Sequence, residues 1–508
     1  MEEAAQDEEG REEGGREEVA HRTARGLASR TAVSAALAAI EALGEGRPLR
    51  LALGSALAAH PGLGPKERRH AAVAARSVAR WLRVCDAALV RARAPRSIPA
   101  DRALLRYLAW RIAVLGEAPD AVARALRLPG PRRPRALGDA ELRSVARALP
   151  RPGPLGPLSL DASGRLIPPP ADPVTALGLR HSVPDALVRR ILAALGPAEA
   201  AECLAALNRE PVITLRVNAA RSSRGAVLDA LRGAGVAAEE GTGPLSVRVR
   251  DRARFFDAPA FRQGLAEVQD EGSQAVVDLC APAEGERWLD LCAGSGGKAL
   301  GLAALGARVT AWDANPRRLS ELPRRARRAG LEVLVSRSEP AGTFDGVLVD
   351  APCSGSGALA REPDARWRID DAAVSRFREG QLAILDRAAP RVRKGGRLVY
   401  ATCSLFREEG EEVVERFLAG HAGFSLAAET RRWPHRQEGA GFFMAQVERE
   451  GAPALATGRG RRRPKGRAGP KVRTTRRNPR RGATSRLTEQ VGRVRKPAPV
   501  ADLAARER

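Results

Sequence analysis

The sequence predicts a multidomain protein with a Rossmann-like α/β domain, preceded by a small α+β module and an all-α domain. First, from about residue 266 onward short apolar strands alternate with helical segments, which is typical of a doubly wound sheet. Second, the residues before this point lack the alternation and contain Pro/Gly-rich breaks. Third, the length of 508 residues favours several domains, since one domain usually holds about 100–200 residues.

Residues 22–148 are rich in Ala, Leu and Arg, and their apolar residues recur at helical spacing, as at Leu104, Leu108 and Leu115. Proline breaks separate the helical stretches, so this segment is predicted to be an all-α domain. Arginines on its outward faces could contact RNA, although an ordinary solvated helix face explains them about equally well. A Pro/Gly-rich linker is predicted for residues 149–174.

Residues 175–265 combine two helical stretches with the alternating strand pattern of residues 211–218, and a further helix and strand follow. This mixture predicts a compact α+β module. The Rossmann-like domain is predicted for residues 266–450, where apolar strands such as residues 287–291 and 346–350 alternate with helices.

The two ends of the chain differ in charge from the middle. Residues 1–21 are predicted to be a disordered acidic tail, because residues 1–18 hold nine acids, two arginines and almost nothing apolar. Residues 451–508 hold 18 Lys or Arg and three acids, and they are predicted to be a disordered basic tail, either an arm for RNA or a solubilising extension. The formal net charge of +25 favours a polyanionic partner, nucleic acid above all or an acidic membrane surface.

Several protein classes are excluded by what the sequence lacks. No apolar run reaches the ~18–20 residues of a membrane-spanning helix, and the acidic N-terminus has no secretory pattern. Six scattered cysteines without a CxxC pair form neither a disulfide scaffold nor a zinc ribbon, and they fit a reducing compartment. We therefore expect a cytoplasmic monomer with no membrane association and no bound metal.

A glycine-rich turn follows the strand that ends at Asp290 and opens the next helix. Such a turn lets the backbone approach a ligand, and a helix N-terminus favours a negative group. A second strand then ends at Asp313, where α/β nucleotide-binding folds place a carboxylate on a ribose. The spacing fits neither a dinucleotide fingerprint nor a P-loop, so the sequence favours S-adenosylmethionine as the cofactor. The predicted cofactor-binding residues are Cys292, Ala293, Gly294, Ser295, Gly296, Gly297, Lys298, Asp313 and Asp350.

Lys298 stands at the mouth of the glycine turn, in a chain with six lysines and 79 arginines. A lysine here runs against the composition, and a compact ammonium can act where a rigid guanidinium cannot. The sequence therefore predicts a role in the site for Lys298, the alternative being a stray surface lysine.

Two cysteines follow the carboxyl ends of two predicted strands. One strand ends at Asp350 and is followed by Cys353, and a later strand ends at Thr402 and is followed by Cys403. Ligands of open α/β sheets bind at this edge, so we expect a reactive pair rather than two buried structural cysteines. The three cysteines on apolar helical faces are predicted to be structural, namely Cys85, Cys203 and Cys280.

A methyl-carrying cofactor, two cysteines, an acid and a basic chain together suit methylation of cytosine at carbon-5. This carbon is a poor nucleophile, and addition of a thiolate at carbon-6 activates it; the adduct must then lose the carbon-5 proton and expel the sulfur. Methyltransferases that act on an amino nitrogen need no cysteine and typically carry an Asn/Asp-Pro-Pro-aromatic turn, where this chain has Ala-Pro-Cys-Ser. The target base must be unstacked, which favours a single-stranded or loop cytosine.

Three motifs resemble those of the RNA (cytosine-C5) methyltransferases of the RsmB/Sun family, namely DxCAxxGGK at 290–298, DAPCSGxG at 350–357 and ATCS at 401–404. The resemblance extends upstream to TLRVN and QDEGSQ and downstream to PHR and GFF. Residues 22–148 would match the helical, NusB-like RNA-binding extension of that family.

The resemblance implies a Rossmann-like enzyme that acts on small-subunit (16S) ribosomal RNA with S-adenosylmethionine. It implies that Cys403 is the nucleophile and that Cys353 assists release of the methylated product. Asp350 and Lys298 would contact the cytosine ring, and the cofactor would lie against the glycine turn with Asp313 on its ribose. Cys403 must be a thiolate, and we expect neighbouring Arg or Lys residues to lower its pKa.

The chain departs from the family pattern at two places. The glycine turn reads CAGSGGK where the family usually has CAAPGGK, and because this turn is still small and flexible we expect cofactor binding to be kept. The acid that the family has after its third strand, near the adenine, is missing. We expect Ser338 or Glu339 to take its place.

Two other functions stay open at this point. One is a carbon-5 methyltransferase of transfer RNA, and the other is a non-catalytic RNA-binding factor of ribosome assembly that keeps the fold as a scaffold. The cysteine pair together with Lys298 and Asp350 disfavours the scaffold, which has no need of them together. The NusB-like extension favours ribosomal over transfer RNA, by analogy alone.

Overall fold

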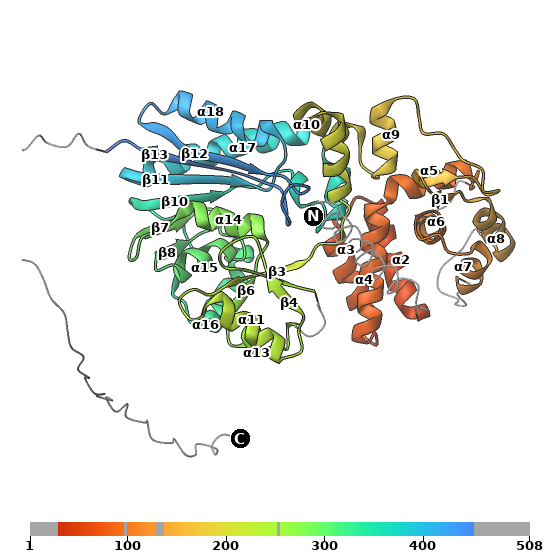
Figure 1. Cartoon of the computed structure of the whole chain (residues 1–508), viewed down its shortest axis with the longest axis horizontal. Helices are drawn as coiled ribbons and strands as arrows, with labels where there is room; N and C mark the ends of the chain where they lie inside the picture. The colour runs from red at the N-terminus through yellow and green to blue at the C-terminus, as the bar shows by residue number, and fades with distance from the viewer. Residues whose placement is uncertain (1–28, 96–98, 127–136, 251–254, 452–508) are drawn as a thin grey trace, which may run out of the picture. The chain divides into compact units, whose positions relative to one another are not determined.

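The structure is a computed structural model, and it describes residues 29–95, 99–126, 137–250 and 255–451 (Figure 1). The predicted acidic and basic tails lie outside the described residues, apart from Gly451. Within the described stretches no helix is both long enough and apolar enough to cross a membrane.

The α/β domain is built on a seven-stranded sheet with the strand order β12-β13-β11-β10-β7-β8-β9. Strands β7 to β11 run parallel, and β13 is antiparallel to its neighbours β11 and β12. This is the Rossmann-like architecture that the alternation of apolar strands and helices predicted. The strands are β7 (Arg287–Asp290), β8 (Arg308–Ala311), β9 (Val333–Val335), β10 (Phe344–Asp350), β11 (Val392–Thr402), β12 (Phe424–Arg432) and β13 (Phe442–Arg449).

Helices cover both faces of this sheet, which explains why its central strands are apolar on both sides (Figure 1). In β10, Leu348 packs in a cluster with α14, α15 and α16, and Val347 packs with α17 and α18 on the other face. The α-helices are α14 (Glu271–Cys280), α15 (Gly297–Ala304), α16 (Leu322–Ala329), α17 (Asp371–Ala388) and α18 (Glu411–Gly420). Short 3-10 helices lie between them, namely η2 (Pro316–Glu321), η3 (Ser356–Ala358), η4 (Pro363–Arg368), η5 (Ala389–Arg391) and η6 (Arg407–Glu409).

The parallel strands β7, β8, β10 and β11 end at the same edge of the sheet. Asp290 is paired with Ala311 of β8 and with Leu348 of β10, and Asp350 is paired with Ala401 of β11. Because of this register, the glycine turn and the turns that carry both cysteines project from one edge.

A four-stranded antiparallel sheet with the order β4-β5-β3-β6 precedes the α/β domain. Its Arg216, on β3, is buried and donates a 2.8 Å hydrogen bond from Nη1 to the backbone oxygen of Gly297. This sheet therefore contacts the glycine turn directly. The elements of this region are α9 (Pro173–Arg180), α10 (Asp185–Ala206), β3 (Ile213–Val217), α11 (Arg224–Gly233), β4 (Ala238–Glu240), β5 (Ser246–Val249), α13 (Pro259–Arg262) and β6 (Ala266–Val268).

The described residues between 30 and 148 form helices joined by short turns, and these helices share one apolar core. Leu104 and Leu108, which stand one helical turn apart in the sequence, are both buried in it. The helices are α2 (Arg30–Gly44), α3 (Leu49–Ala58), α4 (Pro65–Arg80), α5 (Leu82–Arg91), α6 (Pro99–Ala109), the π-helical turn η1 (Trp110–Val114), α7 (Pro119–Ala125) and α8 (Asp139–Ala148).

Part of the predicted linker 149–174 is folded, which corrects the sequence analysis. β1 (Arg151–Gly153) and β2 (Gly156–Leu160) form an antiparallel hairpin, and Leu158 is buried in the core of the helical domain. The Pro and Gly residues form turns here, and the packing of Leu158 into the helical core holds the hairpin against the helical domain.

The short helix η4 joins the helical domain to the α/β domain. Its Arg366 is fully buried and donates hydrogen bonds to the backbone oxygens of Arg80 and Ser182. The next residue, Trp367, donates from Nε1 to the backbone oxygen of Ala79 at 2.7 Å. Buried polar groups of this kind fix the docking, because each needs its partner in place.

Candidate active site

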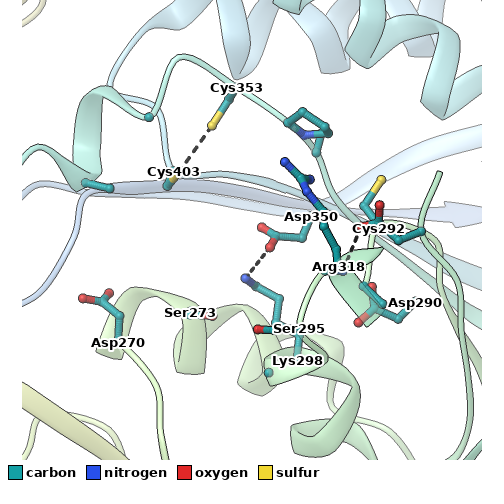
Figure 2. A pocket seen from close by; sticks show the side chains of 18 of the residues that line it. Asp270, Ser273, Asp290, Cys292, Ser295, Lys298, Arg318, Asp350, Cys353 and Cys403 are labelled. Carbon is teal, nitrogen blue, oxygen red and sulfur yellow. Dashed lines mark hydrogen bonds and ion pairs between the residues drawn. The ribbon is translucent and has the colours of Figure 1, made fainter. Parts of the chain in front are cut away.

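A cavity of about 1310 Å³ opens where the parallel strands end (Figure 2). Its walls include every predicted site residue except Gly296, namely Cys292, Ala293, Gly294, Ser295, Gly297, Lys298, Asp313, Asp350, Cys353 and Cys403. Gly296 instead supports the turn from behind. Its φ is +80°, and a Cβ atom there would lie 2.2 Å from Cδ1 of Leu322, so no other residue fits without a shift.

The glycine turn is held by Asp313 from the neighbouring strand. Oδ2 of Asp313 accepts a 2.9 Å hydrogen bond from the backbone N–H of Gly294, and Oδ1 accepts one of 2.8 Å from the backbone N–H of Asn315. Asp313 is predicted to bind a ribose, and in the structure its carboxylate also fixes the backbone that would face the cofactor.

Asp290 lines the cavity, and its side chain is buried. Neither of its carboxylate oxygens has a hydrogen-bond partner among the described residues. Burial, and after it the negative charge of Asp350, raise the pKa of Asp290 from 3.8 to about 7. A buried carboxylate without a donor suits a ligand that brings a cationic or N–H group, as the methionine part of S-adenosylmethionine does.

Lys298 and Asp350 form an ion pair inside the cavity (Figure 2). Nζ of Lys298 lies 2.7 Å from Oδ2 of Asp350 and 5.3 Å from the ring centroid of Phe442. The lysine is 7% exposed, so its ammonium reaches the cavity from a buried position rather than from the surface. The structure thus places Lys298 in the site and not on a solvated helix face.

The two cysteines meet at the same end of the cavity, as Figure 2 shows. The Sγ atoms of Cys353 and Cys403 lie 3.4 Å apart, within hydrogen-bond distance for sulfur, and both side chains are half-buried. The three cysteines that are predicted to be structural lie away from this pair. Cys85, Cys203 and Cys280 are buried, and burial raises the pKa of each thiol.

The two sulfurs have opposite electrostatic surroundings. The hydrogen bond from Cys353 lowers the pKa of the Cys403 thiol, and the positive charges of Arg361 and Lys298 add to this effect. The pKa of Cys353 is raised by the same hydrogen bond, by burial and by the negative charge of Glu409. These opposite shifts favour ionisation of Cys403 over Cys353, with the remaining thiol proton on Cys353.

Two charged residues near the sulfurs were not found from the sequence. Arg361 lines the cavity and forms an ion pair with Asp270. Glu409 is fully buried and accepts hydrogen bonds from Ser354 and Ser404, the residues that directly follow the two cysteines. The repeated Cys-Ser pair is the signal in the sequence that could have pointed to Glu409.

The expected substitute for the missing acid is not in the site, which corrects the sequence analysis. Glu339 is ion-paired with Arg387 and Arg391, and neither Glu339 nor Ser338 is among the residues that line the cavity. Arg387 lies over the ring of Trp312, 5.4 Å from its centroid, and both residues line the cavity. A flat ring and a guanidinium therefore form part of the cavity wall, and the carboxylate of Glu339 is paired with Arg387 outside the lining.

The lining of the cavity is basic. Nine cationic side chains contribute to it, namely Lys298 and the arginines 318, 324, 325, 328, 361, 368, 376 and 387. Six acids also line it, at positions 267, 270, 290, 313, 350 and 362, which leaves an excess of three positive charges. A phosphate-bearing substrate is thus electrostatically favoured. In the described part of the chain no three His, Cys, Asp or Glu side chains gather as a metal site would require.

Two segments of the chain match family models. Residues 277–448 match the family described as 16S rRNA methyltransferase RsmB/F, and residues 183–253 match its ferredoxin-like domain. Two curated relatives are named ribosomal RNA small subunit methyltransferase B, one from Yersinia pseudotuberculosis serotype O:1b (strain IP 31758) and one from Yersinia pestis bv. Antiqua (strain Angola). The chain is 35% identical to each over 284 residues, which are 52% of this chain and 66% of the relative. It thus spans slightly less than two thirds of their length.

Two solved structures have a similar fold. The crystal structure of PH0851 matches with a TM-score of 0.64 and 25% identity, over 83% of this chain and 99% of that one. A methyltransferase homolog protein from Pyrococcus horikoshii matches with a TM-score of 0.50 and 23% identity, over 55% of this chain and 100% of that one, a likeness of fold alone.

Proposed function

We propose that this chain is a methyltransferase of the RsmB/F family, whose models match residues 183–253 and 277–448, and that it forms 5-methylcytosine in small-subunit (16S) ribosomal RNA with S-adenosylmethionine as the methyl donor. The observation that carries the proposal is the pair of cysteine sulfurs, 3.4 Å apart, at the end of a basic cavity that also holds Lys298 and Asp350. Methylation of a nitrogen or an oxygen needs no thiolate, whereas methylation of carbon-5 needs a nucleophile at carbon-6, which one cysteine can provide while the other assists release.

In the proposed reaction Cys403 forms the covalent bond. Its thiolate adds to carbon-6 of the cytosine, and the electron pair of the ring double bond becomes available at carbon-5. S-adenosylmethionine, held by residues 292–298 and Asp313, would supply the electrophilic methyl group that carbon-5 takes, and would leave as the neutral thioether. A base in the cavity then removes the carbon-5 proton, the Sγ–C6 bond breaks, and the thiolate of Cys403 is restored. Cys353, whose thiol lies beside that sulfur, assists the release.

Lys298 and Asp350 are proposed to hold the cytosine ring. Addition of the thiolate transfers negative charge to the ring, and the buried ammonium of Lys298 balances it. The carboxylate of Asp350, which is 33% exposed, can accept a hydrogen bond from the amino group of the base. Their ion pair holds both side chains in position before the substrate arrives.

The cofactor is proposed to lie against residues 292–298, with Asp313 on its ribose and Asp350 beside it. Two features of the chain support this placement. The glycine turn leaves open space above Gly294, where nothing lies within 4 Å of an added Cβ atom. The buried carboxylate of Asp290 below the turn lacks a donor, which a cationic group of the cofactor would provide.

The RNA partner is inferred from charge and from the requirement for an unstacked base. The excess of arginine along the cavity suits the phosphates of a loop or single strand, and the target cytosine must leave its stack to reach the sulfurs. The helical domain of residues 22–148 is proposed to be a NusB-like RNA-binding extension. A cytoplasmic monomer remains the expectation from the sequence.

The test is methyl transfer from radiolabelled S-adenosylmethionine to purified small ribosomal subunits, 16S transcripts and transfer RNA, followed by bisulfite mapping. We expect label at one or a few cytosines of 16S RNA for the full chain, and none for Cys403→Ala. Label on transfer RNA alone would redirect the proposal to that substrate. Absence of both label and cofactor binding by calorimetry would favour the scaffold.

A further inference from the structure

We propose that Glu409 is a positioning residue that decides which of the two cysteines is the nucleophile. Its carboxylate holds the turns of both cysteines together and keeps their shared proton on Cys353. This inference rests on the cysteine chemistry proposed above, and it names the residue that makes the two thiols differ in acidity.

Glu409 binds the residue that follows each cysteine. Its Oε1 accepts a 2.7 Å hydrogen bond from the backbone N–H of Ser354, and its Oε2 accepts one of 2.6 Å from the hydroxyl of Ser404. The hydroxyl of Ser354 also donates to Oε2. One fully buried carboxylate therefore connects the turn after β10 to the turn after β11, and so sets the distance between the sulfurs.

Other groups hold Glu409 itself in place. Its backbone oxygen accepts hydrogen bonds from the Tyr400 hydroxyl at 2.8 Å and from Oγ1 of Thr402 at 3.1 Å, both at the end of β11. Nε2 of Gln381, on α17, lies 3.3 Å from Oε1 and donates a 2.9 Å hydrogen bond to the backbone oxygen of Pro352. The network reaches from a strand through the carboxylate to a helix, which leaves Glu409 little freedom to move.

The charges around the two sulfurs are arranged asymmetrically. The pKa of Cys353 is raised first by its hydrogen bond with Cys403 and then by burial and by negative charge on Cys403, and the negative charge of Glu409 adds to these effects. The pKa of Cys403 is lowered first by its hydrogen bond with Cys353; burial and the carboxylate of Asp350 oppose this, and the positive charges of Arg361 and Lys298 support it. Inside the protein these charges are screened less than in water. Removal of the charge on Glu409 should thus let the proton move between the sulfurs.

The experiment measures alkylation of the two cysteines by iodoacetamide between pH 6 and pH 9 in the full chain, with peptide mass spectrometry to separate them. Alkylation follows the thiolate, so the ratio of the Cys403 rate to the Cys353 rate reports where the proton sits. In the wild type we expect faster reaction at Cys403. In Glu409→Gln we expect this ratio to fall about tenfold, the effect of one pKa unit, and the pH profile of Cys403 to move upward.

Two further variants separate charge from structure. Glu409→Asp keeps the charge and should keep the preference for Cys403. Glu415→Gln removes an exposed carboxylate that pairs with Arg407 and should change nothing. An unchanged ratio in folded Glu409→Gln overturns the proposal. If that variant does not fold, faster reaction at Cys353 in the wild type or in Glu409→Asp overturns it. Because the assay needs neither RNA nor methyl donor, failure of the proposed methylation would leave this result standing.

Discussion

Nζ of Lys298 lies 2.7 Å from Oδ2 of Asp350, and the ammonium that makes this contact is packed on the ring of Phe442. The site is therefore shaped for a small cation at the end of a flexible stem. A planar guanidinium is larger and directs its donors differently, so it cannot take the same position.

We predict that Lys298→Arg lowers kcat/KM for methyl transfer by about 100-fold or more, the usual effect of removing one electrostatic contact to a transition state. The measurement is the initial rate with 16S RNA as substrate. Lys394→Arg is the matched control, since Lys394 is exposed and lies outside the cavity. Equal rates for Lys298→Arg and wild type would remove Lys298 from the mechanism.

Replacement of Cys353 by alanine should leave the enzyme unable to release its product. We expect Cys353→Ala to accumulate a covalent complex with RNA that survives denaturing electrophoresis and depends on S-adenosylmethionine. Cys403→Ala and the double variant should form no such complex while they still bind RNA. A Cys353→Ala enzyme that turns over normally and forms no adduct would contradict the assigned roles.

Asp290 should make stability depend on pH. Its pKa is raised from 3.8 to about 7 in the folded state, so between these values the folded chain binds more protons than the unfolded chain, and stability falls as pH rises. One pKa unit corresponds to about 1.4 kcal/mol. The free energy of unfolding of Asp290→Asn, relative to that of the wild type, should therefore rise by up to about 4 kcal/mol between pH 4 and pH 8.

Denaturant unfolding of the unliganded chain at several pH values measures this difference. Asp345→Asn is the control, because the hydrogen bond from Arg393 lowers the pKa of Asp345 and its contribution is constant above its ordinary pKa. A constant difference between Asp290→Asn and wild type over the range would show that Asp290 is ionised throughout.

Gly296 and Gly285 allow strain and collision to be separated. Both have positive φ, +80° and +78°, but an added Cβ atom collides with Leu322 only at Gly296. We expect alanine at either position to cost about 1–2 kcal/mol for the left-handed conformation. Only Gly296→Ala should cost more and also weaken cofactor binding in calorimetry. Equal affinity for the cofactor in both variants would show that the turn tolerates the shift.

The sequence predicts which residues meet in the cavity when their positions follow from the ends of paired strands. Cys353 and Cys403 stand 50 residues apart and meet because β10 and β11 are paired in parallel, a relationship that apolar strands and intervening helices predict. Lys298 could be predicted because it runs against the composition of the chain.

The sequence does not predict a residue's contacts when its ion-pair, packing or hydrogen-bond partner comes from a distant segment of the chain. Glu339 pairs with arginines of α17 and η5, so its chemistry depends on helices that its own surroundings do not reveal. The Pro/Gly-rich stretch around Leu158 folds as a hairpin because this side chain packs into the core of the helical domain. Glu409 carries no periodic pattern, and its role follows only from two serines on different turns.

The buried guanidinium of Arg366 has a consequence for how the protein can be divided. Arg361 and Ala365, which form one wall of the cavity, belong to the same short stretch as Arg366 and Trp367. The side chains of that stretch donate hydrogen bonds to backbone oxygens at the end of α4 and in the segment before α10. Truncation of the N-terminal helices would therefore remove the backbone oxygens that hold this wall of the cavity in place. A shortened protein that keeps the cavity must retain these helices.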